Sequence, residues 1–274
     1  MTKCHVPLLF LLPLVILGCT PDNPVTSDTP TNLATPKAAN ATSRMTTEEV
    51  ETLTAAINAA GIITDAQAEK LSTAQAVSLN GITEITNSQT RRLSSVDELQ
   101  LNGLTSITNE QAQHLSNVNW LQLGGVTSLT DQQASKLSAV TWALNLNGLT
   151  TITDIQIESL SKVAKLELNG LTAITETQAE HLKQVGALHL NGLESLTETQ
   201  AKFLGEVDQL SLNSLTTLTD QQATNLSRVQ WGLSLQGLAL ISDAQAKALE
   251  KVDRLSVPQF IQEKIDKIKQ TIAP

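Results

Sequence analysis

The 274-residue sequence contains no tyrosine, and aromatic residues make up only 2% of it. Its two cysteines, Cys4 and Cys19, are too few for the disulfide framework of a small secreted domain or for a zinc site built on cysteine. Positive charge is also scarce, because 18 lysines and arginines stand against 27 aspartates and glutamates and give a formal net charge of −9. Nucleic acids are bound through clustered lysine and arginine, and no basic stripe occurs here, so the composition argues against a nucleic-acid partner.

The longest apolar run lies close to the N-terminus. Lys3 supplies a positive start, and Pro7–Leu17 has the length of the apolar part of an export signal, too short to span a bilayer comfortably. The run ends in Ile16-Leu17-Gly18-Cys19, which resembles the lipobox of bacterial lipoproteins. This resemblance implies that residues 1–18 are a lipoprotein signal peptide and that Cys19 becomes the first mature residue. Cys19 would then carry acyl chains such as palmitate and tie the protein to a membrane. The alternative interpretation is an ordinary secretory signal with an incidental cysteine.

Residues 19–45 are predicted to form a disordered tether. The segment is rich in threonine, proline, asparagine, serine and alanine, and it cannot bury enough apolar surface to offset the entropy of ordering it. A tether of this kind would let the folded part stand off the bilayer. The residue after Cys19 is Thr20, whereas an acidic residue there would resemble an inner-membrane retention signal. We therefore expect a lipid-anchored protein of the cell envelope, with the outer membrane or cell surface favoured.

The rest of the sequence is dominated by one internal repeat. Leu166–Gln184 reads LELNGLTAITETQAEHLKQ, and its skeleton recurs from Val77 to Val252. The steps are 22 residues, except for steps of 23 residues into Leu144 and Leu233. A fixed period of this size is typical of a solenoid, in which each unit is ordered only by stacking on the next.

Each repeat combines a strand signal with a helix signal. In Leu166-Glu167-Leu168 the two leucines alternate with a polar residue, which predicts a short strand, and Asn169-Gly170 predicts a turn because both residues tolerate the backbone angles of tight turns. Thr175 and Gln178 have the spacing of a helix-starting capping box. The same Ser/Thr-x-x-Gln spacing occurs nine times, from Thr64 to Gln245.

These signals predict a right-handed, curved α/β solenoid of strand–turn–helix repeats. Parallel strands lie about 4.8 Å apart whereas packed helices need about 8–10 Å, so the strands should line the inner side and the helices the outer side. Helical caps are expected at both ends. The predicted parts are an N-terminal cap helix at residues 46–61, the repeat solenoid at 62–257 and a C-terminal cap helix at 258–274.

The repeats resemble those of the leucine-rich-repeat family over about residues 62–257. The resemblance is carried by the Leu-x-Leu strands and by a column of asparagines, Asn80, Asn102, Asn147, Asn169, Asn191 and Asn213. It implies a ladder of side-chain bonds from these asparagines to the backbone of neighbouring loops, and a role in presenting a binding surface. The asparagine here follows the second strand leucine at once, rather than three residues later, and Gly124 and Gln236 interrupt the column.

Candidate binding residues lie along the predicted inner face. Trp120, Trp142 and Trp231 each stand two residues after a helix valine, and tryptophan is enriched in protein-binding hot spots and also supports sugar stacking. The alternative is that these rings fill gaps between loops. Glu167 and His189 are further candidates, as neighbours in a polar column that could otherwise be an ordinary solvated sheet face. The column is Ser78, Gln100, Gln122, Asn145, Glu167, His189, Ser211 and Ser234.

The sequence offers little for catalysis or for a metal or other cofactor. Acidic residues recur at the first position of the predicted helices, as at Asp131 and Asp154, where the helix dipole accounts for them better than calcium does. We find no nucleophile motif and no glycine-rich phosphate loop, so we expect no enzyme and no cofactor. The predicted function is a lipid-anchored envelope module that binds or scaffolds a protein partner. The alternatives are a passive envelope lipoprotein without a ligand, or a carbohydrate-binding module that uses the tryptophans.

Overall fold

The computed structural model describes residues 44–272 of the chain. The predicted signal peptide at 1–18, Cys19 and all but the end of the predicted tether at 19–45 lie outside the described residues. Ser43–Pro274 form one compact unit.

Helices and strands alternate along the described chain. The strands are β1 (Ala76–Ser78), β2 (Glu98–Gln100), β3 (Trp120–Gln122), β4 (Ala143–Asn145), β5 (Lys165–Glu167), β6 (Ala187–His189), β7 (Gln209–Ser211), β8 (Gly232–Ser234) and β9 (Leu255–Ser256). The helices are α1 (Thr47–Ala60), α2 (Asp65–Leu71), α3 (Asn87–Leu93), α4 (Asn109–Leu115), α5 (Asp131–Leu137), α6 (Asp154–Leu160), α7 (Glu176–Leu182), α8 (Glu198–Leu204), α9 (Asp220–Leu226), α10 (Asp243–Leu249) and α11 (Gln259–Ile272).

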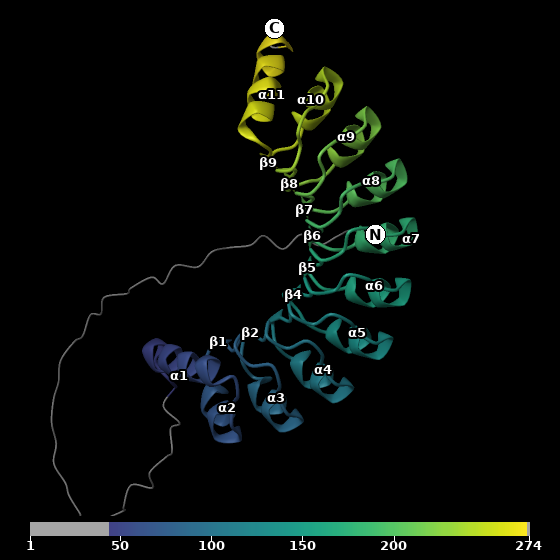
Figure 1. The fold of residues 1–274 in the computed structure, drawn as a ribbon. Coiled ribbons are helices and arrows are strands. Elements are labelled where there is room, and N and C mark those ends of the chain that lie inside the picture. The colour runs from purple at the N-terminus through teal and green to yellow at the C-terminus, as the bar shows by residue number, and fades with distance from the viewer. Residues whose placement is uncertain (1–43, 273–274) are drawn as a thin grey trace, which may run out of the picture. The chain divides into compact units, whose positions relative to one another are not determined.

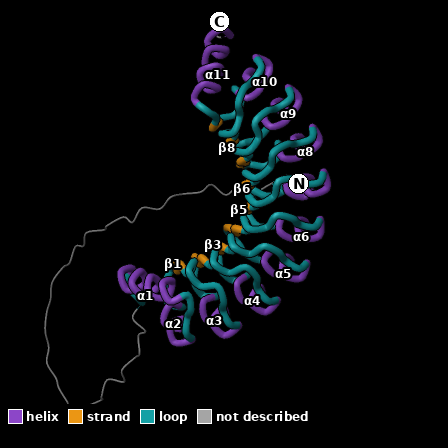
Figure 2. The backbone as a smooth tube through the Cα atoms, viewed as in Figure 1, coloured by secondary structure: helices purple, strands orange, loops and turns teal. Residues whose placement is uncertain are grey.

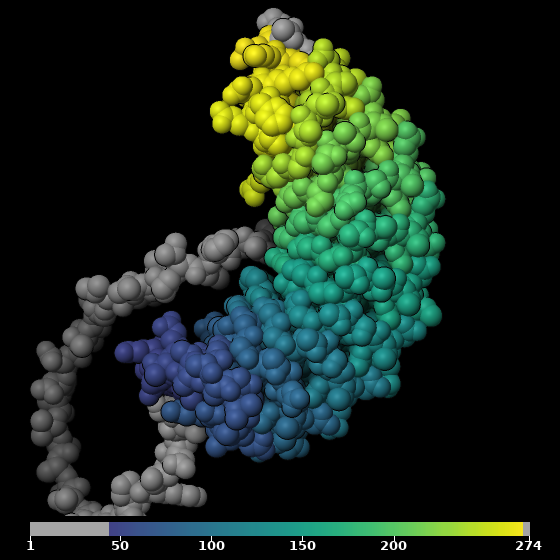
Figure 3. Space-filling view, in the orientation of Figure 1, coloured from purple at the N-terminus to yellow at the C-terminus, as the bar shows by residue number. Residues whose placement is uncertain are grey.

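The strands of the described part form one parallel sheet in the order β1 to β9, with consecutive strands as neighbours. The register is constant, so that Leu144 pairs with Leu166 and Leu166 with Leu188. Within this unit the strands line the inner side of a curved row and the short helices line its outer side (Figures 1 and 2). The prediction of an α/β repeat solenoid is confirmed, and in the space-filling view its repeats pack into one continuous curved body (Figure 3).

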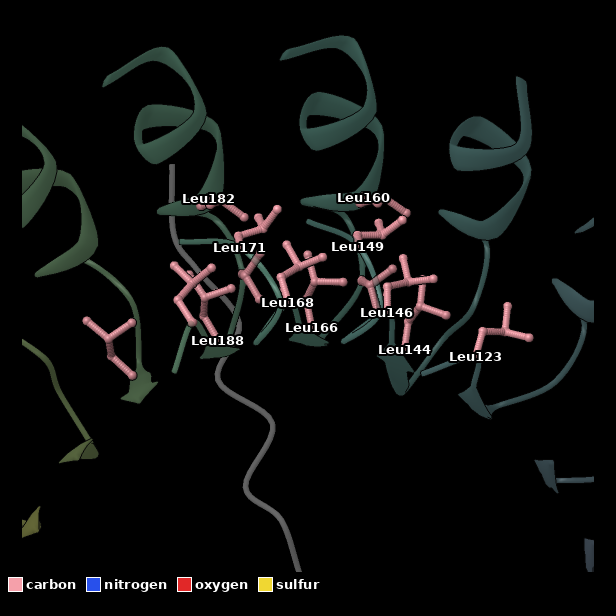
Figure 4. Packing of buried hydrophobic residues seen from close by; sticks show 14 of the residues in the cluster. Leu123, Leu144, Leu146, Leu149, Leu160, Leu166, Leu168, Leu171, Leu182 and Leu188 are labelled. Carbon is pink, nitrogen blue, oxygen red and sulfur yellow. The ribbon is translucent and has the colours of Figure 1, made fainter. Parts of the chain in front are cut away.

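The core is a layer of aliphatic side chains between the sheet and the outer helices. Leu166, Leu168, Leu171 and Leu182 of one repeat are at most 1% exposed. Figure 4 shows Leu166 and Leu168 on the strand side of this layer and Leu182 on the helix side, next to the equivalent leucines of the neighbouring repeats. Each repeat therefore completes its core only against its neighbours, which is the behaviour expected of a solenoid.

The turn glycine is required for a different reason from the one that the sequence suggested. The positive-φ glycine of the described residues is Gly61, which ends α1 with φ 71°, and Gly170 does not share this conformation. A Cβ on Gly170 would instead lie 2.3 Å from the main-chain oxygen of Asn147 and 2.4 Å from that of Leu149 in the preceding repeat. The explanation by tolerant backbone angles was therefore wrong, and close stacking of successive turns is what needs glycine here.

The asparagine column joins the repeats through their backbones. The main-chain N–H of Asn169 donates to Oδ1 of Asn147 at 2.9 Å, and the N–H of Asn191 donates to Oδ1 of Asn169 at 2.9 Å. The ladder implied by the resemblance is therefore present. Gly124 cannot supply an acceptor, and Oδ1 of Asn145 accepts from the Asn147 N–H in its place, at 2.9 Å.

Helix α1 covers the open edge of β1. Asn58 donates through Nδ2 to the main-chain oxygen of Ser78 at 3.0 Å and accepts at Oδ1 from the N–H of Gly81 at 2.8 Å. These bonds imitate the contacts that a preceding repeat would make. At the other end Ile261 and Ile265 of α11 are buried against the core. Both ends of the apolar layer are thus protected from water, as solenoids require.

Candidate binding surface on the inner face

The inner-face column is a connected polar row. Glu167 of β5 pairs in register with Asn145 of β4 and with His189 of β6, as the sequence predicted. Side chains of the column also bond to the asparagine ladder, since Ser211 Oγ donates to Asn191 Oδ1 at 2.6 Å and Ser234 Oγ donates to Asn213 Oδ1 at 2.7 Å. These bonds fix the side-chain orientations and give the solenoid a rigid inner surface.

The three tryptophans lie at this face and are exposed. Trp120 opens β3 and is 36% exposed, whereas Trp142 and Trp231 lie just before β4 and β8 and are 61% and 63% exposed. The extra residue of the repeat that holds Trp142 falls in this pre-strand loop, where the N–H groups of Trp142 and Ala143 both donate to the main-chain oxygen of Asn119. Trp142 and Trp231 therefore present most of their surface to solvent, whereas most of Trp120 is covered.

Trp120 and Trp142 share one groove of about 600 Å³. The other residues that line it are Gln75, Ala76, Asp97, Glu98, Asn119 and Thr141. Inside the groove Asn119 donates through Nδ2 to Asp97 Oδ1 at 3.1 Å and accepts at Oδ1 from Thr141 Oγ1 at 2.7 Å. The rings of these two adjacent repeats therefore line one common groove.

Lys165 connects Trp120 with Glu167. The Lys165 ammonium lies 5.5 Å from the centroid of the Trp120 ring and forms an ion pair of 2.6 Å with Glu167. Ala143 separates Lys165 from Trp120 in the strand register and is only 5% exposed. Glu167 forms its ion pair with Lys165 on its own strand, and the salt bridges of the described residues do not join Glu167 to His189.

His189 is half-buried, and its pKa is lowered by its surroundings. Burial lowers the pKa of His189 below its ordinary value, the nearby Lys165 ammonium lowers this pKa further, and Glu167 acts in the opposite direction. Trp231 lies with His189 in a separate groove of about 230 Å³, which Gln209 and Arg254 also line. The structure therefore divides the five candidate residues between the Trp120–Trp142 groove, the Trp231–His189 groove and Glu167 between them.

Sequence reasoning missed several residues of the first groove. Asp97, Asn119 and Thr141 come from the loops that lead into strands, and Glu98 from a first strand position. Lys165, which lies over the Trp120 ring but does not line the groove, also holds a first strand position. A signal was available, because Glu98, Trp120, Ala143 and Lys165 occupy one register column of adjacent strands. The polar column predicted from the sequence lies two residues further along each strand, as Gln100 does relative to Glu98.

The row of acidic residues at the helix starts has partners in the next repeat. Thr153 Oγ1 donates to Asp131 Oδ1 at 3.2 Å, and Thr175 Oγ1 donates to Asp154 Oδ1 at 3.3 Å. In residues 44–272 no group of three or more histidine, cysteine, aspartate or glutamate side chains could hold a metal ion. The same part of the chain has no helix long and apolar enough to cross a membrane.

Comparison with known proteins gives structural likenesses only. No family model and no curated protein matches the sequence. An internalin (inlF) from Listeria monocytogenes is similar in structure, with a TM-score of 0.49 and 17% sequence identity. The match covers 73% of this chain and 61% of the internalin, so this chain spans less than two-thirds of that protein's length. An internalin C2 (inlC2) of the same organism gives a TM-score of 0.49 and 15% identity over 75% of this chain and 92% of its own length. A chain of the Toll–Spatzle complex of Drosophila gives a TM-score of 0.48 and 14% identity over 61% of this chain and 24% of its own. The solenoid assignment rests on the strand order and register of this chain itself.

Proposed function

We propose that this protein is a lipid-anchored module of the cell envelope that binds a partner protein on its inner face. The observation that carries the proposal is the exposed pair Trp120 and Trp142 in one groove of a rigid sheet face. Large aromatic rings usually contribute most to folding when they are buried, so two exposed rings that line one groove favour a role in binding. Tryptophan is also among the residues most enriched in the energetic centres of protein interfaces.

The anchor in this proposal is Cys19, on the basis of the lipobox-like Ile16-Leu17-Gly18-Cys19. A formal net charge of −9 offers no electrostatic attraction to anionic lipid, so a covalent lipid is the better means of holding the protein at a membrane. Replacing Cys19 by alanine should release the protein from the membrane fraction. Retention of the Cys19→Ala variant in washed membranes would contradict the anchor.

The partner is best sought on intact cells by site-specific photo-crosslinking. A photoreactive residue at Gln75 lies in the inner-face groove, and the same residue at Ser135, exposed on α5, serves as the matched control on the outer side. We expect one reproducible crosslinked neighbour from position 75, and we expect that this neighbour is not crosslinked from position 135. Diffuse labelling from both positions would support a passive envelope component instead.

A further inference from the structure

The groove at the tryptophans continues along the inner face toward α1. It shares Gln75, Ala76 and Glu98 with a second hollow of about 540 Å³ that lies against α1. Glu51 of α1 and the cation Arg44 line the far hollow, Asp97 lines the near one and Glu98 lines both, so carboxylates outnumber cations along the two hollows. The two hollows together, called the acidic groove below, run from α1 past β1 and β2 to the Trp120–Trp142 pair.

Two of its carboxylates have no cationic partner. Across residues 44–272, the salt bridges include neither Asp97 nor Glu98. Each carboxylate accepts a bond from a neutral amide, from Asn119 Nδ2 to Asp97 at 3.1 Å and from Gln100 Nε2 to Glu98 at 3.0 Å. A neutral amide brings no opposite charge, and each of these bonds engages one of the two carboxylate oxygens.

The aromatic end of the groove already accommodates a cation. The Lys165 ammonium lies 5.5 Å from the centroid of the Trp120 ring, a distance at which the ring quadrupole attracts a positive charge. Trp142 is the more exposed of the two rings, at 61% against 36% for Trp120. Trp142 thus offers a second ring next to unpaired carboxylates, and that combination suits lysine or arginine.

We propose that the acidic groove binds an extended segment of the partner protein that carries lysine or arginine side chains. The inference rests on the proposed function and names the chemistry of the partner at this site. Neighbouring parallel strands lie about 4.8 Å apart, so the path from β1 to β4 covers about 14 Å, or about four extended residues at 3.3 Å each. Within that length cationic side chains can reach Glu98, Asp97 and the ring of Trp142.

A sugar chain is the competing occupant, and the contacts favour the cationic segment over it. Sugar recognition uses open ring faces together with amide groups that are free to bond. Lys165 already lies over the Trp120 ring, and the Asn119 amide is engaged on both sides, by Asp97 and by Thr141. The Gln75 amide at the groove wall is exposed and open to either occupant, but the carboxylates Asp97 and Glu98 have no salt bridge, and a cationic segment would supply the opposite charge that a neutral sugar does not.

Tryptophan fluorescence provides the test, since the chain has three tryptophans and no tyrosine. The full chain in uncharged detergent is titrated with a short peptide of alternating lysine and glycine, with its glutamate counterpart, and with a soluble chito-oligosaccharide. We expect the lysine peptide alone to bind, and to bind more weakly as salt is raised. Asp97→Asn combined with Glu98→Gln keeps both acceptor oxygens and should weaken binding about fivefold to tenfold. Trp142→Ala should weaken it about tenfold.

The control removes the same charge elsewhere on the chain. Asp208 stands at the position equivalent to Asp97 in a later repeat, and Glu206 lies near Asp208 in the sequence. Neither residue lines the acidic groove. The double variant Asp208→Asn and Glu206→Gln should therefore leave the affinity for the lysine peptide unchanged. Equal weakening by the two charge pairs would overturn the inference, as would Trp142-dependent binding of the oligosaccharide in place of the lysine peptide. If the crosslink to the neighbour still forms in the variant with Asp97→Asn and Glu98→Gln, this inference is overturned and the proposed function stands. If no neighbour is crosslinked at all, the proposed function is overturned.

Discussion

The side-chain nitrogen Nε2 of Gln178 donates a hydrogen bond of 2.9 Å to the main-chain oxygen of Ile152, the residue just before the helix cap of the preceding repeat. The same side chain closes the capping box of its own helix, because its Oε1 accepts from the N–H of Thr175 at 3.0 Å. The bond to the preceding repeat is made by every capping-box glutamine that follows Gln67. These glutamines are Gln89, Gln111, Gln133, Gln156, Gln178, Gln200, Gln222 and Gln245. One amide therefore starts a helix and joins two repeats.

This double role explains why glutamine, and not glutamate, fills the column. Either residue can complete a capping box, but only an amide can also donate. Glu49 completes the box of α1, which has no repeat before it, and lies exposed. We predict that Gln178→Glu, which removes the donor and places a carboxylate at a site only 6% exposed, lowers the free energy of unfolding by about 1–3 kcal/mol. Urea unfolding at neutral pH measures the loss.

Acid should partly rescue the Gln178→Glu variant. Burial raises the pKa of the new carboxyl in the folded state above its unfolded value of about 4.3. Below that value the carboxyl is protonated in both states and can donate its hydrogen bond, so the penalty for burying a charge disappears. The deficit relative to wild type should therefore shrink as pH falls and grow as pH rises. The matched change Glu49→Gln should alter stability by less than about 0.5 kcal/mol. Equal losses for the two variants would contradict the assigned role.

The sequence predicts the architecture well, because the period of Leu166 and Leu168 and the spacing of Thr175 and Gln178 are local signals. It does not predict which groups meet between repeats, since this depends on how far successive turns and helices approach one another. The bond from Gln178 to Ile152 is of this kind. The position of Lys165 over Trp120 is another, because it bridges two strand spacings across a small alanine.

His189 gives a prediction of pH dependence. Its pKa is lowered in the folded protein, by burial first and by Lys165 second, while Glu167 raises it. Because the folded pKa lies below the unfolded one, His189 stabilises the fold above the unfolded value of about 6.5, and this contribution is lost as pH falls through the folded value. In an NMR titration Lys165→Met should raise the pKa of His189 and Glu167→Gln should lower it. Shifts of the same sign for both variants would contradict this account.

The turn glycines give a prediction about close packing. Gly170→Ala would place a Cβ 2.3 Å from the main-chain oxygen of Asn147, and it should lower the free energy of unfolding by about 1–3 kcal/mol. Gly232 is the matched control, because its Cβ would meet nothing nearer than the Arg254 main-chain oxygen at 3.6 Å. Gly232→Ala should be neutral or stabilise by up to about 1 kcal/mol through the unfolded chain. Thermal unfolding of the pair distinguishes contact from general glycine effects.

Asn145 gives the prediction that is most specific to this chain. At Asn102, Gly124, Asn169, Asn191, Asn213 and Gln236, the N–H two residues after the strand donates to the asparagine of the preceding repeat. Gly124 provides no side chain for Asn147, and Asn145 Oδ1 accepts from the Asn147 N–H at 2.9 Å instead. Asn145→Ala should leave this half-buried N–H without its acceptor and lower the free energy of unfolding by about 1–3 kcal/mol. Ser234→Ala, at the equivalent position of β8, removes only a side-chain donor, because Asn213 Oδ1 still accepts from the Gln236 N–H at 3.0 Å. In urea unfolding, Ser234→Ala should lower the free energy of unfolding by less than Asn145→Ala does. Faster amide hydrogen exchange at Asn147 in the Asn145→Ala variant should locate the lost bond. An unchanged exchange rate there would show that the strand asparagine does not compensate for the gap at Gly124.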